Sequence, residues 1–227
     1  TQGGPVEPRA SYLLALLAER RGDSATARKH LAEAAGLVDA LPPEWVAGHE
    51  QLLMVGALAH HAGGQLEKAK AYLDAIVSRY PNNLGARKLL ASINFEMKDY
   101  ARATGLLEHV LRLQPADTQA LYLLGRINLA QRRYAKASEY LEQAAQSGGV
   151  DAKAMLGFSR LAEGDVVGAT RNLQIAFDKA PGDAVVANAL ANTMLRGGDA
   201  KGALVVAQRA AEAAPGNPLA FNLLGTI

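Results

Sequence analysis

Asparagine side chains recur at a spacing that suits contact with a peptide backbone. Asn188 and Asn192 are four residues apart, and Asn222 follows Asn188 by the same interval at which alanines recur along the chain. Residues four apart share one face of a helix. An amide offers both a donor and an acceptor, so a row of amides can pair with an extended peptide without reading its side chains. The alternative is that these asparagines only solvate an open surface.

An aromatic and cationic group is the second candidate binding site. Tyr122 and Arg126 are four residues apart, and Phe158 follows them. Arginine and aromatic residues are enriched among the residues that dominate interfaces, so this patch suits a peptide anchor or an acidic sugar. Phe158 is equally compatible with packing between adjacent helices. Lys88 precedes Tyr122 by the interval of the alanines and is a further candidate.

The other reactive side chains form no catalytic or metal-binding pattern. The chain has no cysteine, which excludes thiolate ligands, thiol nucleophiles and disulfides in this segment. It contains no G-x-S-x-G, H-E-x-x-H or G-x-x-x-x-G-K-[ST] motif. His60 and His61 are adjacent, which places them about 100° apart around a helix and not toward one metal ion. We expect no enzymatic activity, no cofactor and no metal.

Charge and hydropathy support neither a nucleic-acid partner nor a membrane-spanning helix. The 24 basic and 22 acidic residues give a net charge of +2. The chain also lacks a long stripe of basic residues, which a nucleic-acid partner would favour. No apolar run approaches the roughly 18 residues of a membrane span. Residues 1–7 are interpreted as a linker or expression scar. A helix expected from about residue 218 stops midway, so we expect a fragment of a longer protein.

Alanine recurs along the chain at a nearly constant interval, and a leucine usually follows four positions later. The alanines are Ala27, Ala69, Ala103, Ala137, Ala169 and Ala203. A period of about 34 residues is typical of stacked helix–turn–helix units, so we predict an all-α solenoid of antiparallel helix pairs. The predicted units span residues 8–41, 50–83, 84–117, 118–149, 150–183 and 184–217, with a partial unit at 218–227.

The turn inside each unit carries its own signal. Gly164-Asp165 is representative: glycine permits a left-handed backbone at the end of one helix, and aspartate caps the next helix. Arg132-Arg133 replaces this pair in the fourth unit, and we predict a less favourable turn there.

Small and polar residues inside the helices are expected to serve packing. Gly125 and Gly157 lie on first helices, where we expect them to oppose the alanines of the second helices and allow close approach. Asn94 and Asn128 occupy positions that usually hold a large residue. We expect each to form a structural hydrogen bond at the contact between the two helices of its unit.

Two irregularities interrupt the period. Eight extra residues, 42–49, follow the first unit and include Trp45, the only tryptophan. Proline suits the first turn of a helix, so we predict one elongated helix over residues 43–62. Trp45 either anchors a partner or, as we favour, covers an exposed helix end. The fourth unit is two residues short around 147–149, which predicts a tighter junction.

These features resemble the tetratricopeptide repeat (TPR) superfamily across essentially the whole chain. The resemblance implies a right-handed superhelical α-solenoid whose first helices line a concave face. It places on that face the seven candidates Lys88, Tyr122, Arg126, Phe158, Asn188, Asn192 and Asn222. TPRs that clamp chaperone C-termini have lysine and asparagine at the two positions that Lys88 and Ser92 occupy here, so co-chaperone function is disfavoured.

Three segments carry a narrower resemblance: PNNLGARKLLAS at 81–92, LGFSRLAEGD at 156–165 and NPLAFNLLG at 217–225. They are similar to the large TPR lipoprotein that accompanies exosortase/PEP-CTERM systems in exopolysaccharide-producing Gram-negative bacteria. This resemblance implies a periplasmic protein tethered to a membrane by an N-terminal lipid. It also implies a role in exopolysaccharide assembly or export, or in PEP-CTERM protein sorting. The lipidated cysteine of that family is absent here, as truncation would explain.

We therefore expect a non-catalytic protein–protein interaction scaffold of the cell envelope. Its partner would be a protein or peptide in the concave groove, with the exopolysaccharide machinery as a candidate. The alternatives are a substrate-targeting or assembly module of a larger enzyme complex, and a direct polysaccharide binder. The apolar surface expected on the truncated last helix also predicts end-to-end self-association of this fragment.

Overall fold

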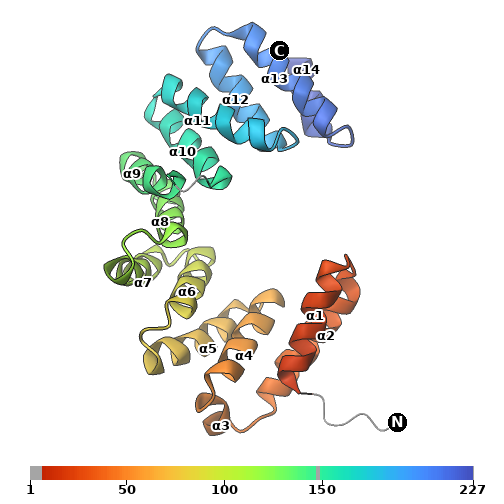
Figure 1. Cartoon of the computed structure of the whole chain (residues 1–227), viewed down its shortest axis with the longest axis vertical. Helices are drawn as coiled ribbons and strands as arrows, with labels where there is room; N and C mark the ends of the chain where they lie inside the picture. The colour runs from red at the N-terminus through yellow and green to blue at the C-terminus, as the bar shows by residue number, and fades with distance from the viewer. Residues whose placement is uncertain (1–6, 147–148, 227) are drawn as a thin grey trace. The chain divides into compact units, whose positions relative to one another are not determined.

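The computed structural model describes residues 7–146 and 149–226, and these form fourteen α-helices and no strand (Figure 1). The predicted all-helical fold is confirmed. Most of the predicted linker, the part over residues 1–6, lies outside the described residues. So do residues 147 and 148 of the predicted tight junction, and residue 227.

The chain divides into two compact units, the first ending at Val110 and the second beginning at Leu111. The first contains α1 (Pro8–Arg20), α2 (Ser24–Asp39), α3 (Pro43–Ala47), α4 (Glu50–Ala62), α5 (Leu66–Arg79), α6 (Leu84–Glu96) and most of α7 (Tyr100–Leu113). The second contains α8 (Thr118–Ala130), α9 (Tyr134–Ala145), α10 (Val150–Glu163), α11 (Val166–Lys179), α12 (Ala184–Arg196), α13 (Ala200–Ala213) and α14 (Pro218–Thr226). From α8 to α14 each helix contacts the next one along the chain, as stacked helix pairs require.

A left-handed residue ends the first helix of every pair from α1/α2 to α12/α13. These residues are Gly22, Gly64, Lys98, Arg132, Gly164 and Gly198. At Gly164 the next N–H, that of Asp165, donates to the carbonyl of Arg160 at 2.9 Å, which satisfies an otherwise unpaired helix end. The Asp165 side chain then accepts the N–H of Gly168 at 2.8 Å and caps α11. The predicted turn chemistry is confirmed here.

Two turns lack the favoured glycine. Arg132 has a φ of 60° and Lys98 a φ of 63°, which side chains other than glycine adopt at a cost. The prediction of a less favourable turn at Arg132 is therefore confirmed. Lys98 carries the same strain, although the sequence pattern did not single it out.

Close packing within a pair joins a glycine to a leucine. A Cβ on Gly125 would lie 2.5 Å from Cγ of Leu141, and one on Gly157 would lie 2.6 Å from Cγ of Leu173. The prediction that these glycines oppose the repeated alanines is wrong. The leucine one turn beyond each alanine is long enough to cross to the partner helix, and it takes the space that the missing Cβ leaves.

The buried asparagines hydrogen-bond within their own helices. Nδ2 of Asn94 donates to the carbonyl of Leu90, and Nδ2 of Asn128 donates to that of Leu124, both at 2.8 Å. The predicted structural hydrogen bond is confirmed for both residues, and its acceptor is the backbone of the same helix. A carbonyl four residues earlier lies within reach of a short amide side chain and satisfies its donor without a partner helix.

The predicted single helix over residues 43–62 is also wrong. The structure contains a short α3 and a separate α4, with His49 between them in an extended conformation at φ −123° and ψ 99°. Gly48 weakens helix continuation at this point. Nδ1–H of His49 donates to the carbonyl of Trp45 at 2.6 Å and so satisfies the end of α3.

A polar network joins α2, α4 and α5 in the first unit. His60 is 2% exposed, and its Nε2 lies 2.9 Å from Oδ1 of Asp39. The hydroxyl of Tyr72 donates to the same oxygen at 2.8 Å, and Nζ of Lys68 donates to Oδ2 at 2.7 Å. Burial alone would raise the pKa of Asp39, but these hydrogen bonds outweigh it and lower the pKa to about 2.

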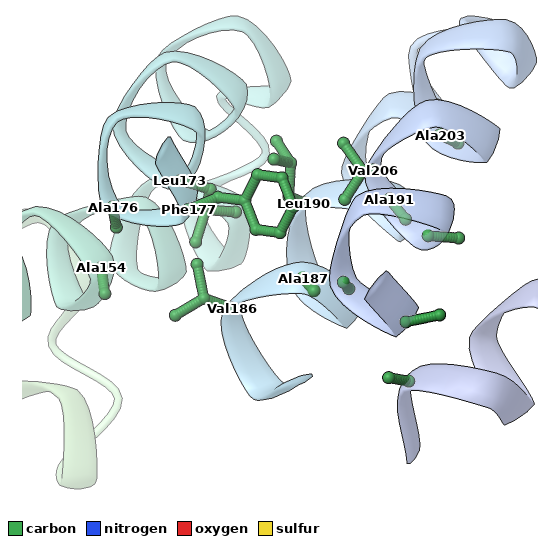
Figure 2. Packing of buried hydrophobic residues seen from close by; sticks show 14 residues of the cluster. Ala154, Leu173, Ala176, Phe177, Val186, Ala187, Leu190, Ala191, Ala203 and Val206 are labelled. Carbon is green, nitrogen blue, oxygen red and sulfur yellow. The ribbon is translucent and has the colours of Figure 1, made fainter. Parts of the chain in front are cut away.

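The core of the second unit is built from interleaved aliphatic side chains and one large ring (Figure 2). Phe177 of α11 is fully buried beside Leu173, and Leu190 of α12 packs against them. The guanidinium of Arg209 lies 5.0 Å from the Phe177 ring centroid and also contacts Asp178 at 3.0 Å. This layer fixes α11, α12 and α13 against one another.

Candidate partner-binding face

The first helices of the pairs carry the predicted binding residues. In the second unit α8 contacts α10, α10 contacts α12, and α12 contacts α14. Residues at the same position of successive repeat units therefore lie on neighbouring helices. Six candidates lie there: Tyr122, Arg126, Phe158, Asn188, Asn192 and Asn222. Lys88 lies half-buried on α6 of the first unit, whereas the other six lie in the second unit.

The asparagine pair on α12 is exposed and already partly organised. Nδ2 of Asn192 donates to Oδ1 of Asn188 at 2.5 Å. This bond orients both amides. Among the described residues, Oδ1 and one N–H of Asn192 have no protein partner, and neither has the NH₂ group of Asn188. Those groups can accept from and donate to a peptide backbone. Asn222 on α14 is likewise exposed.

Exposed apolar side chains flank these amides. The sequence analysis assigned the apolar surface of the last helix to self-association and did not include either side chain in the candidate binding face. Val185 is 63% exposed and lies three residues before Asn188; Leu219 is 55% exposed and lies three residues before Asn222. A spacing of three keeps each apolar residue on the face of its asparagine. The signal was available, because Val185 and Leu219 are themselves separated by one repeat unit. The face thus offers apolar contact beside backbone-type hydrogen bonding.

Tyr122 and Arg126 interact directly on α8. The guanidinium carbon of Arg126 lies 5.7 Å from the ring centroid of Tyr122, within the range of a cation–π contact. Burial raises the pKa of the Tyr122 hydroxyl; the charge of Asp151 adds to this, and that of Arg126 opposes it. Tyr122 also packs against two buried clusters, one containing Leu121 and the other Leu141, so its ring serves partly in packing.

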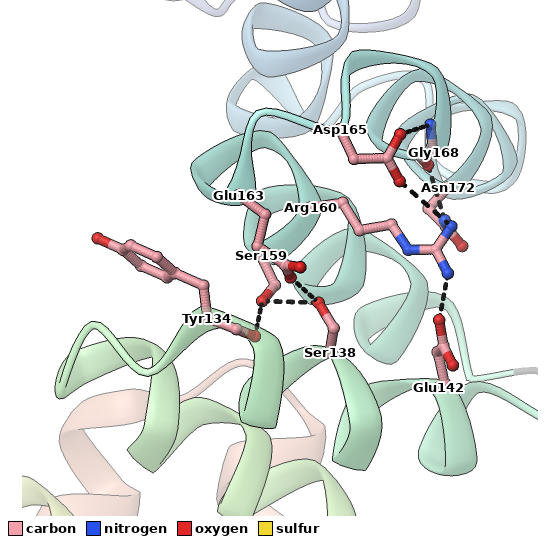
Figure 3. Close-up of polar contacts among 9 residues, drawn as sticks. All are labelled: Tyr134, Ser138, Glu142, Ser159, Arg160, Glu163, Asp165, Gly168 and Asn172. Carbon is pink, nitrogen blue, oxygen red and sulfur yellow. Dashed lines mark hydrogen bonds and ion pairs between the residues drawn. The ribbon is translucent and has the colours of Figure 1, made fainter.

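Phe158 is partly buried and packs against the core cluster that contains Leu173 and Phe177. The packing interpretation of Phe158 therefore accounts for part of its surface, and the remainder is open to solvent. The neighbouring Ser159 is fully buried and donates to the carbonyl of Tyr134 at 2.9 Å (Figure 3). This contact is one of those that hold α10, the helix that carries Phe158, against α9.

Charged contacts hold α10 against its neighbours on the other side of the same helix. Arg160 forms an ion pair with Glu142 of α9, and its Nη1 lies 3.8 Å from Oδ2 of Asp165 (Figure 3). Ser138 of α9 bonds both Ser159, at 3.0 Å, and Glu163. The helix that carries Phe158 is thus held by polar contacts as well as by its apolar face.

Over residues 7–146 and 149–226, no group of three or more His, Cys, Asp or Glu side chains is placed to hold a metal ion. None of the described helices combines the length and apolar character needed to cross a bilayer. The groups described above provide hydrogen bonding, a cation–π contact and apolar contact on this face.

Sequence comparison decides the family. A family profile described as "Tetratricopeptide repeat" matches residues 94–156 and 160–227, together more than half of the chain. The chain is a tetratricopeptide repeat protein. Two further profiles of the same description match residues 52–83 and 2–43 of this TPR protein. No curated protein matches it.

Solved structures share the TPR fold. PilF of Pseudomonas aeruginosa has a TM-score of 0.70 at 15% identity, covering 97% of this chain and 97% of that one. YrrB, described as a TPR protein with an unusual peptide-binding site, has a TM-score of 0.61 at 19% identity, with coverages of 77% and 91%. MamA from Desulfovibrio magneticus RS-1 has a TM-score of 0.58 at 21% identity, with coverages of 78% and 96%. At these identities the likeness concerns the fold alone.

Proposed function

We propose that this TPR protein is a non-catalytic scaffold that holds an extended peptide segment of a partner protein along α12 and α14. The observation that carries the proposal is the exposed pair Asn188 and Asn192, already aligned by a hydrogen bond. Main-chain pairing with these amides supplies affinity, and apolar contact with Val185 and Leu219 selects side chains of the peptide. The peptide-binding site named for YrrB makes this use of the fold reasonable.

The test is proximity labelling in native cells with the double variant Asn188→Ala/Asn192→Ala. The variant removes the amides without touching the core, so labelling of the true partner falls while thermal stability stays unchanged. Asn82→Ala is the matched control, because Asn82 is exposed in a turn of the first unit. Unchanged labelling by the double variant would contradict the peptide site.

The setting we propose is the periplasmic side of the cell envelope. There the scaffold assists exopolysaccharide assembly or export, or the sorting of PEP-CTERM proteins, anchored by a lipid on a preceding segment. The three segments quoted above support this setting by resemblance. The full-length gene is the test: a lipoprotein signal supports the envelope setting, whereas a fused catalytic domain favours a substrate-targeting or assembly module of an enzyme complex.

A second candidate function, direct binding of an acidic polysaccharide, is favoured by the contact between Tyr122 and Arg126. An arginine held beside an aromatic ring suits a carboxylated sugar. Tyr122→Ala and Arg126→Ala should then abolish retention of the producer's polymer while leaving helicity intact. No affinity of the wild-type chain for that polymer would exclude this function.

Self-association is a further proposal for this fragment. Leu219 and Phe221 on α14 are 55% and 50% exposed, and burying such side chains between copies is favourable. Sedimentation at increasing concentration should show association, and Phe221→Glu should weaken it. A strictly monomeric wild-type chain in concentrated solution would count against this contact.

A further inference from the structure

A cavity of about 700 Å³ lies beside the short helix α3 in the first unit, whereas α12 and α14 belong to the second unit. Its walls come from the start of α1, the segment after α2, α3 itself and the start of α4. The lining residues used below are Arg9, Trp45, His49, Glu50 and Gln51. Sites for small molecules commonly enclose about 300–1,000 Å³, so the volume suits one. The insertion that breaks the repeat period creates this cavity, and the stacking of helix pairs does not require it.

The indole of Trp45 forms an aromatic wall of the cavity. It is 49% exposed, and its ring centroid lies 4.5 Å from that of His49. The bond from Nδ1 of His49 to the Trp45 carbonyl holds the imidazole in place against the indole. Trp45 therefore does not simply cover a helix end. Its indole lines the cavity and is held in place by the adjacent His49 side chain.

Mixed hydrogen-bonding groups stand beside this ring. Nη1 of Arg9 donates to Oε1 of Gln51 at 2.6 Å, which turns the amide so that its NH₂ group stays available. Oε1 of Glu50 accepts from Nδ2 of Asn83 at 2.6 Å. Within the described part of the chain, the Gln51 NH₂ group, the second Glu50 oxygen and Nε1 of Trp45 have no hydrogen-bond partner. The cavity thus offers donors and an acceptor next to an aromatic surface.

We propose that the Trp45 cavity binds a neutral sugar ring. Every sugar hydroxyl both donates and accepts, so it pairs with amide, indole and carboxylate groups together. The C–H face of the ring stacks on the indole, which has an apolar body and a polar edge. Glu7 and Glu50 outnumber the single guanidinium of Arg9 in the lining, and this balance disfavours an acidic sugar. An apolar peptide side chain would leave these polar groups unpaired, which is costly.

The test uses the fluorescence of the full chain, because Trp45 is the only tryptophan and reports on this cavity alone. The probes are maltotriose, cellotriose and chitotriose, with tri-galacturonic acid as the acidic probe and an apolar hexapeptide as the peptide probe. A saturable change with at least one neutral trisaccharide is expected. The affinity for the neutral trisaccharide should not depend on salt concentration, because a neutral sugar forms no ion pair with the protein. Gln51→Ala should weaken binding at least about tenfold.

Matched variants keep the test interpretable. Gln208→Ala removes the same amide from an exposed position of α13 and should leave the titration unchanged. Saturation-transfer NMR covers the variants that lack tryptophan: Trp45→Phe should keep the neutral sugar bound, and Trp45→Ala should lose it. Gln51 is exposed, so thermal melting of Gln51→Ala should match that of the wild type.

Three outcomes would overturn the proposal: no response to any neutral trisaccharide, a response only to tri-galacturonic acid or the hexapeptide, or sugar binding that survives both Trp45→Ala and Gln51→Ala. The proposal does not depend on the asparagine face, because it concerns other residues in the other unit. Each can therefore fail while the other stands.

Discussion

Gly157 of α10 lies directly under the side chain of Leu173 of α11, so that a Cβ on the glycine would sit 2.6 Å from Cγ and 2.9 Å from Cδ2 of the leucine. The backbone nitrogen of Leu173 would lie 3.2 Å from the same Cβ. Because one of the obstacles is backbone, the leucine cannot relieve the contact by changing rotamer alone. The separation of the two helices is therefore set by the absence of one carbon atom.

Gly157→Ala should lower the free energy of unfolding by about 1–3 kcal/mol, because the added methyl group forces α10 and α11 apart. Urea unfolding followed by circular dichroism measures this. Gly105→Ala is the control, since a Cβ there meets nothing within 4 Å in the exposed face of α7. That variant should gain up to about 1 kcal/mol from helix propensity alone. Equal effects of the two substitutions would contradict the packing argument.

Arg132→Gly should stabilise the chain by about 1 kcal/mol. Arg132 holds a φ of 60° between α8 and α9, and glycine adopts that conformation without the steric cost. Gly164→Ala is the reverse substitution, from glycine to a residue with a Cβ, in the equivalent turn between α10 and α11. There φ is 88° and a Cβ would meet open space, so only the backbone conformation is tested. This variant should destabilise the chain by a similar amount. If thermal melts move in the same direction for both variants, backbone strain is not the cause.

Asp39→Asn should destabilise the chain at neutral pH by about 1 kcal/mol, a size discounted for the partial exposure of Asp39 to water. The pKa of Asp39 is about 2 in the folded chain and 3.8 ordinarily. A lowered folded pKa means that the charged carboxylate stabilises the fold above 3.8, and that this stability is lost as the pH falls toward 2. The difference between the wild type and the variant should therefore disappear over that range. A difference that is independent of pH would exclude the charge of Asp39 as its source.

Prediction from the sequence succeeded where the signal is local or periodic. The alanine and leucine period gave the helix pairs, and the glycine–aspartate turns gave the caps, as Gly164 and Asp165 illustrate. It failed where the answer depends on which atoms meet in space. Nothing in the period shows that Gly157 faces Leu173 and not an alanine, because both lie on the same stripe of α11.

The candidate binding residues show the same difference between what spacing predicts and what only the structure shows. Spacing placed Asn188 and Asn192 on one face, and the structure adds the bond that aligns them. Spacing did not reveal the cavity beside Trp45, which depends on the break between α3 and α4 at His49. A single helix was the natural expectation from propensity; Gly48 weakens the helix at this point, and the hydrogen bond from His49 to the Trp45 carbonyl satisfies the end of α3.

Comparing Phe158 with Phe177 distinguishes a residue that contacts the core with part of its ring from one that is fully buried in it. Phe177 is fully buried, so Phe177→Ala should cost about 3–5 kcal/mol in unfolding free energy. Phe158 contacts the same cluster with part of its ring only, so Phe158→Ala should cost clearly less, about 1–2 kcal/mol. Chemical denaturation of both variants gives the two values.

If Phe158 also anchors a partner, the conservative variant Phe158→Leu should restore most of the stability, because its apolar bulk fills the same space. Phe158→Ala should then also reduce proximity labelling of the partner, and Phe158→Leu should not restore it, since leucine lacks the ring that an aromatic anchor requires. Stability and labelling recovering together in Phe158→Leu would show that Phe158 acts only through the packing of α10. A cost for Phe158→Ala as large as that for Phe177→Ala would make the residue part of the core and remove it from the candidate face.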